Sequence, residues 1–112
     1  MRGDYTELNK LQGWLMLHSE SYGWEFERID KRWDETGREN HQIIVYQKGL
    51  EGTRARIWDV ICHYGSYGFE QGLLEAMGSI IDEEFWHDTV AGYLTAEKVI
   101  ELIEITYGKK EG

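Results

Sequence analysis

Proline is absent from the 112 residues, and cysteine occurs once, as Cys62. Without proline there is no Pro-rich linker to mark a boundary, so we expect residues 1–112 to form one domain, with 109–112 as a frayed tail. A lone cysteine cannot close an intrachain disulfide or supply most of a zinc site. These two scarcities favour a single domain in a reducing compartment, and the cytoplasm is the expected location.

Long hydrophobic runs are missing too, and the stretch from Trp14 to Leu17 is typical of the longest. Such runs are too short for a transmembrane helix, and residues 1–4 lack an apolar stretch suited to export. The sequence therefore predicts neither a membrane protein nor a secreted one. Its 41% apolar content, with 5 Trp, 7 Tyr and 3 Phe, suffices to close a core and argues against intrinsic disorder.

Basic residues are the minority, because 12 Lys and Arg face 21 Asp and Glu, for a net charge of −9 at pH 7. A surface of that sign repels phosphates, so direct binding of nucleic acid is not expected. The excess gathers after residue 67, where ten acidic residues face three basic ones. Such a segment is either a solvated face that keeps the protein soluble or a mimic of nucleic acid that enters a basic groove.

Hydrophobic periodicity predicts a helix over residues 5–18 with Asp4 as its N-cap. Period-two patterns then predict three strands, with a bulge near Arg28 in the first. In the third strand, one face is expected to carry Trp58, Val60 and Cys62. The expected strands cover residues 24–33, 42–46 and 56–63.

A glycine-rich loop over residues 64–68 follows the strands, and residues 70–78 are expected to form a short helix that ends at Gly78. The last helix is expected to begin at Thr95 as N-cap and to end at Gly108. Its expected buried face consists of Val99, Ile100, Ile103 and Tyr107. The order αβββαα predicts an α+β domain in which a small three-stranded antiparallel sheet carries helices on one face.

The histidines and the cysteine show no metal-ligand spacing, so no metal or other cofactor is expected. Cys62 and His63 adjoin on a strand and point to opposite faces, so they cannot act as a catalytic pair, and Cys62 is expected in the core. An enzyme or ligand-binding domain around residues 63–68 remains an alternative, with His63 as base and Ser66 or Tyr67 as polar partner. The four histidines are His18, His41, His63 and His87.

Two aromatic residues are expected to be partly exposed, because Trp33 adjoins a turn and Tyr67 lies in the glycine-rich loop. Tyrosine and tryptophan are favoured where proteins bind one another, so both are candidates for partner contact. A second alternative is therefore a protein-interaction module unrelated to nucleic acids, or a homodimer that buries Trp33 or Trp86.

Acidic stretches mark the C-terminal half at Asp82-Glu83-Glu84, at Asp88, and at Glu97, Glu101 and Glu104. The chain resembles, in general character, the small acidic proteins that phages and mobile elements of Gram-positive bacteria carry against host defence, including anti-CRISPR proteins. The resemblance lies in these acidic stretches, in the size of the chain, in its single cysteine and in its lack of proline. The resemblance implies a non-enzymatic inhibitor of a basic nucleic-acid-binding protein such as the CRISPR effector nuclease Cas9.

Such a DNA mimic would compete for the arginines with which the effector reads its target. Residues 97, 101 and 104 are spaced so that their carboxylates share one face of a helix. No catalytic residue is expected. The expected partner-binding residues are Asp82, Glu83, Glu84, Asp88, Glu97, Glu101, Glu104, Trp33 and Tyr67.

Overall fold

The computed structural model describes residues 4–31, 40–63, 66, 68–81 and 90–109. In this part of the chain, one helix precedes and one follows five strands along the sequence, in the order αβββββα, with short 3-10 segments between them. The helices are α1 (Thr6–His18) and α2 (Ala96–Tyr107). The strands are β1 (Trp24–Lys31), β2 (Asn40–Lys48), β3 (Arg54–His63), β4 (Leu74–Gly78) and β5 (Val90–Leu94). The 3-10 segments are η1 (Ser19–Tyr22), η2 (Leu50–Gly52) and η3 (Phe69–Gln71).

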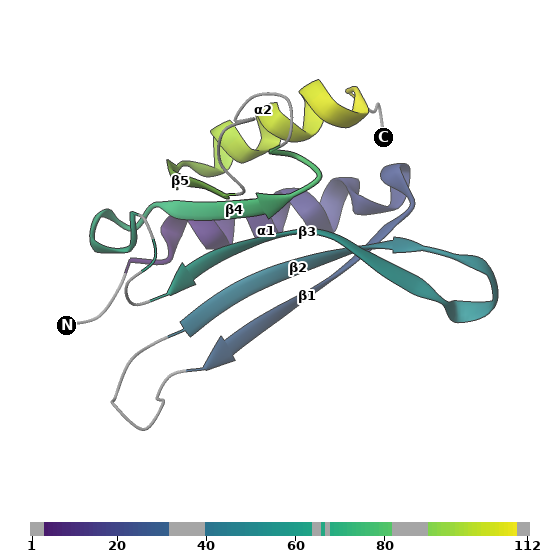
Figure 1. Cartoon of the computed structure of the whole chain (residues 1–112), viewed down its shortest axis with the longest axis horizontal. Coiled ribbons are helices and arrows are strands. Elements are labelled where there is room, and N and C mark those ends of the chain that lie inside the picture. The colour runs from purple at the N-terminus through teal and green to yellow at the C-terminus, as the bar shows by residue number, and fades with distance from the viewer. Residues whose placement is uncertain (1–3, 32–39, 64–65, 67, 82–89, 110–112) are drawn as a thin grey trace.

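The strands form one antiparallel sheet in the order β1-β2-β3-β4-β5, so each strand pairs with its neighbour in sequence (Figure 1). This meander leaves β1 and β5 at the two edges. The β2–β3 hairpin projects beyond β4 at the right of Figure 1, and α1 passes behind the sheet. The expected α+β class is confirmed, but the three-stranded sheet is wrong because the sheet has five strands.

The expected helix over residues 70–78 is also wrong. Its second half forms β4, where Ala76 pairs with Val60 on one side and with Ala91 of β5 on the other. Leu-Leu-Glu-Ala-Met suits a helix in isolation, but pairing on both sides and burial override that preference. Gly78 does not cap a helix: its φ is +107°, and a Cβ there would lie 2.6 Å from the carbonyl oxygen of Ile57.

Two predicted features, the bulge near Arg28 and the start of the first helix, lie at other positions in the structure. The β1–β2 register runs without interruption from Trp24 to Lys31, so there is no bulge at Arg28. Register shifts lie instead in the β2–β3 pair, next to Val45, and in the β4–β5 pair, between Leu74 and Ala76. The first helix begins at Thr6 rather than directly after Asp4, although the Asp4 carboxylate still accepts a hydrogen bond from the Thr6 N–H at 3.0 Å.

One core lies between the sheet and both helices, and the expected inward face of β3 is confirmed. On this side, Trp24 packs edge-on against Trp58 and Tyr107, with ring centroids 5.8 and 5.1 Å apart. In α2, Leu102 is fully buried, whereas the expected Ile100 and Tyr107 are half-buried. The fully buried side chains at the centre of this core include Leu8, Leu11, Leu15, Ile43, Val45, Val60, Cys62, Leu74, Val99 and Ile103.

The two helices are also joined by a polar contact at the start of α2. The predicted N-cap is confirmed, because the Thr95 hydroxyl accepts from the Lys98 N–H at 3.1 Å. A second cap comes from α1, since the Glu7 carboxylate accepts from the Ala96 N–H at 2.8 Å. A carboxylate at a helix N-terminus accepts a hydrogen bond from an otherwise unpaired N–H donor and interacts favourably with the positive end of the helix dipole. The start of α2 is therefore fixed against α1.

Replacing Gly78 by alanine is expected to destabilise the protein by about 2–4 kcal/mol, because positive φ and the β3 backbone both oppose a Cβ. Gly13→Ala is the matched control: nothing lies within 4 Å of its Cβ position inside α1, so it is expected to stabilise by about 0.5–1 kcal/mol. Urea unfolding monitored by tryptophan fluorescence measures both. Equal effects of the two substitutions would contradict the close approach of β4 to β3.

Candidate functional site

Three of the nine expected partner-binding residues lie in the described part of the chain, all on α2. Glu97 and Glu101 are exposed and Glu104 is half-buried. The opposite side of α2 is buried, so the helix is fixed with these carboxylates on its outer side. The other six residues lie outside the described residues: Trp33, Tyr67, Asp82, Glu83, Glu84 and Asp88.

The outer side of α2 is not uniformly acidic. Lys98 lies among the carboxylates and pairs with Glu101, with Nζ and Oε1 3.3 Å apart. Neither Glu97 nor Glu104 makes an ion pair with any described residue. The negative charge of this face therefore comes mainly from Glu97 and Glu104, which lie on either side of the ion-paired Glu101.

Basic side chains elsewhere are largely neutralised within the fold. Arg54 lies over the Tyr46 ring at 3.9 Å and pairs with Glu25 at 3.6 Å. Arg56 pairs with buried Asp59 at 3.1 Å. Lys10 pairs with Glu7, and Arg28 with Asp30. Because these cations already have carboxylate partners, they do not form an unpaired basic patch that could counter the excess negative charge.

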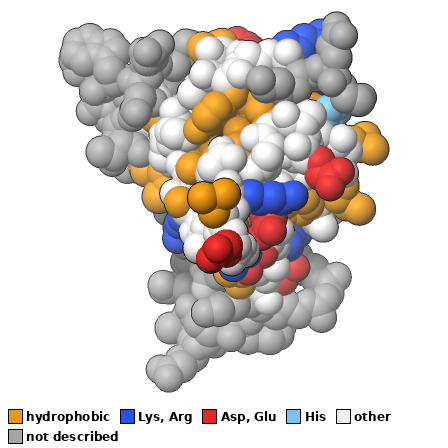
Figure 2. Space-filling model, turned by 90° about the vertical axis from the view of Figure 1, so that its right-hand side faces the viewer, with side chains coloured by type: hydrophobic (Ala, Val, Ile, Leu, Met, Phe, Trp, Pro, Cys, Tyr) orange, Lys and Arg blue, Asp and Glu red, His pale blue; other side chains and the backbone are white. Residues whose placement is uncertain are grey.

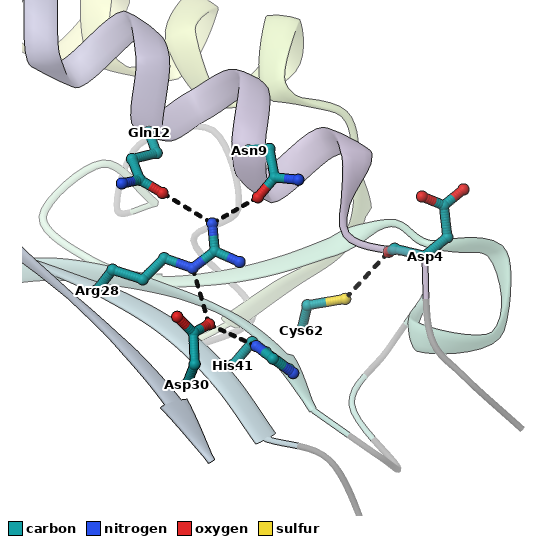
Figure 3. A network of polar contacts seen from close by, with 7 residues as sticks. All are labelled: Asp4, Asn9, Gln12, Arg28, Asp30, His41 and Cys62. Atoms are coloured by element: carbon teal, nitrogen blue, oxygen red, sulfur yellow. Dashed lines mark hydrogen bonds and ion pairs between the residues drawn. The ribbon is translucent and has the colours of Figure 1, made fainter. Parts of the chain in front are cut away.

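A polar cluster that sequence reasoning missed lies between α1, the end of β1 and the start of β2 (Figure 3). Arg28 donates from Nη1 to the side-chain oxygens of Asn9 and Gln12, at 2.7 and 2.9 Å, and from Nε to Asp30 at 2.9 Å. The same Asp30 oxygen lies 2.5 Å from His41 Nδ1. Periodicity gives no sign of this cluster, because it depends on which face of β1 meets α1.

The cluster changes the ionisation of Asp30, which is half-exposed. Burial by itself raises the pKa of this carboxyl, but the hydrogen bonds from His41 and Arg28 outweigh it, so the pKa lies below its ordinary value. A carboxyl whose pKa is lowered by folding stabilises the fold while it is ionised. That contribution is present above the pKa of the unfolded chain and is lost as the pH falls through the folded pKa.

Cys62, His41 and Asp30 lie in one row across three strands, because His41 pairs with Asp30 on one side and with Cys62 on the other. This order resembles a cysteine-histidine-aspartate triad. The thiol, however, is fully buried, and burial raises the pKa of Cys62 to about 11. A catalytic cysteine needs the opposite shift. The row is better explained by packing, and Cys62 belongs to the core as expected.

Ser66 and His63, two of the residues of the loop-based alternative, lie in the described part of the chain. The Ser66 hydroxyl donates to the His63 carbonyl at 2.8 Å and accepts from the His63 N–H at 3.0 Å, so it holds a turn. Burial lowers the pKa of His63 below the ordinary histidine value. His63 and Cys62 lie on opposite faces of β3, as expected. Tyr67, the other expected partner in this loop, lies outside the described residues.

Within the described ranges, no three His, Cys, Asp or Glu side chains come together as a metal site would require. No helix in this part of the chain is long and apolar enough to cross a membrane. Comparisons with protein-family models, curated proteins and solved structures find no match to this chain.

Asp30→Asn is expected to flatten the loss of stability as the pH falls through and below the ordinary pKa of an aspartate, because it removes a carboxyl whose pKa folding lowers. At pH 7 the variant is expected to lose less than about 1 kcal/mol, since Asp30 is half-exposed. Urea titrations at several pH values measure this, with Glu70→Gln, an exposed carboxylate on η3, as the control. A slope unchanged from the parent protein would contradict the role of the cluster.

Proposed function

We propose that this protein is a non-enzymatic binding protein whose α2 outer face engages a basic groove of a nucleic-acid-processing partner and inhibits it. The resemblance described above implies a CRISPR effector nuclease as the partner. The observation that carries the proposal is the position of Glu97 and Glu104, exposed or half-exposed and outside any ion pair among the described residues, on a helix that is capped at Thr95 and buried along its other side.

The spacing of these carboxylates suits a mimic of a phosphate backbone. From residue 97 to residue 104 an α-helix rises roughly 10 Å, at 1.5 Å per residue. Phosphates along one strand of a duplex follow at about 3.4 Å of axial rise, so the axial separation of the two carboxylates equals the rise of about three nucleotides. Since α2 is fixed against α1 through Glu7, little ordering is needed on binding.

The distribution of charge supports the same conclusion. The described arginines at positions 28, 54 and 56 are paired with carboxylates inside the fold, so they do not oppose the acidic face. The remaining negative field attracts a basic partner over a long range and weakens as salt rises. Binding by this mechanism requires no catalytic group.

Glu97→Lys/Glu104→Lys is expected to weaken inhibition by at least about tenfold, because the two α2 carboxylates that make no ion pair among the described residues become cations. The readout is DNA binding by a purified effector nuclease at about 50 and about 200 mM salt, where an electrostatic competitor is expected to weaken at the higher salt. Glu20→Lys/Glu70→Lys is the matched control, with the same change in net charge on exposed residues of η1 and η3.

The two variants separate a specific face from total charge. Retention of inhibition in the control and its loss in the α2 variant would support the proposal. Equal loss in both would show that only net charge matters, and absence of any effect on DNA binding would contradict inhibition of this partner class.

A protein-interaction module is the second candidate, favoured by exposed apolar side chains. Met16 and Leu17, near the end of α1, are 70% and 78% exposed, and Ile105 of α2 is 53% exposed. Figure 2 shows the right-hand end of the molecule, where hydrophobic side chains lie in several groups between charged ones. Under this candidate, Leu17→Glu would abolish partner binding, whereas the α2 charge variant would leave it intact.

A further inference from the structure

β1 is an edge strand of the sheet. It is eight residues long, pairs with β2 in an uninterrupted register, and no strand of the described residues pairs with its other side. Proteins commonly protect an edge of this length with a bulge, a proline or a very short strand. β1 has none of these devices. Charge is a further device, and the arrangement of charges along β1 bears on what the edge can pair with.

These charges are arranged with opposite signs on either side of Ile29. Directly on either side of Ile29, Arg28 is matched by Asp30. We propose that β1 is a homodimer interface, in which the β1 strands of two copies pair antiparallel about a twofold axis at Ile29 and join the two sheets into one of ten strands. Each Arg28 then lies opposite Asp30 of the second copy.

The neighbouring registers are unfavourable. Pairing centred on Arg28 would place the Arg28 residues of the two copies opposite each other. Pairing centred on Glu27 or on Asp30 would likewise place two carboxylates opposite each other. Like charges directly opposite one another destabilise a strand pair, whereas opposite charges stabilise it. Centring on Ile29 instead brings two half-buried isoleucines together. Charge complementarity therefore selects both the partner, a second copy of this chain, and the register.

The faces of the sheet agree with this arrangement. Arg28 and Asp30 lie on the side that meets α1, since Arg28 donates to Asn9 and Gln12 (Figure 3). Residues directly opposite in an antiparallel pair share a face, so an axis perpendicular to the sheet keeps the helices of both copies on one side. The described contacts of Arg28 use Nε and Nη1, while Asp30 is 46% exposed. Arg28 and Asp30 of both copies would form a square of alternating charge.

The interface is independent of the proposed function, because α2 takes no part in it. Sedimentation velocity of the full chain over a concentration series is expected to show a monomer–dimer equilibrium. Asp30→Arg, which faces Arg28 of the second copy with a like charge, is expected to raise the dimer dissociation constant by at least about tenfold. The double variant Arg28→Asp/Asp30→Arg restores opposite charges in the same register and is expected to recover dimerisation, with circular dichroism checking that both fold.

Cross-linking tests the register without altering the charges. Ile29→Cys places two thiols opposite each other at the axis, so mild oxidation is expected to give a covalent dimer readily. In Glu25→Cys the two thiols would lie roughly 27 Å apart, at about 3.4 Å per residue, so no such dimer is expected. The native Cys62 is buried and does not compete. A monomer at all concentrations, or equal cross-linking of both variants, would overturn the proposal.

Discussion

The contact of α1 with one face of the sheet is the constraint on which the other features depend. Leu8, Leu11 and Leu15 are fully buried in the core on that face. Once α1 is in place, Glu7 lies where it can cap α2, and Asn9 and Gln12 lie where they can accept from Arg28. The apolar contact supplies the burial, and the polar contacts at its margins fix the position of α2 and of β1.

The margin at β1 shows how a core contact determines the chemistry of a surface. Arg28 is held by amides of α1 on one side and by Asp30 on the other, and Asp30 in turn contacts His41. Each of these groups satisfies another, so the cluster acts as a structural support rather than as a reactive site. The same is true of Cys62, whose burial raises its pKa, and of Ser66, whose hydroxyl holds a turn.

Several elements could be predicted from the sequence because their signals are local. Three leucines at helical spacing predicted α1, and Thr95 and Gly108 predicted the limits of α2. The alternation of Trp58, Val60 and Cys62 predicted the inward face of β3. β4 could not be found in this way, since Leu74–Gly78 has helical composition and becomes a strand only through its partners β3 and β5. The cluster around Arg28 left no periodic signal either.

By itself, the sequence determined the α+β class, the strong negative charge and the face of α2 that carries carboxylates, because composition and residue spacing are enough for each. Only the tertiary structure decided the five-stranded sheet, the need for glycine at position 78 and the position of β1 at an edge. Those features arise from pairing between residues distant in the chain.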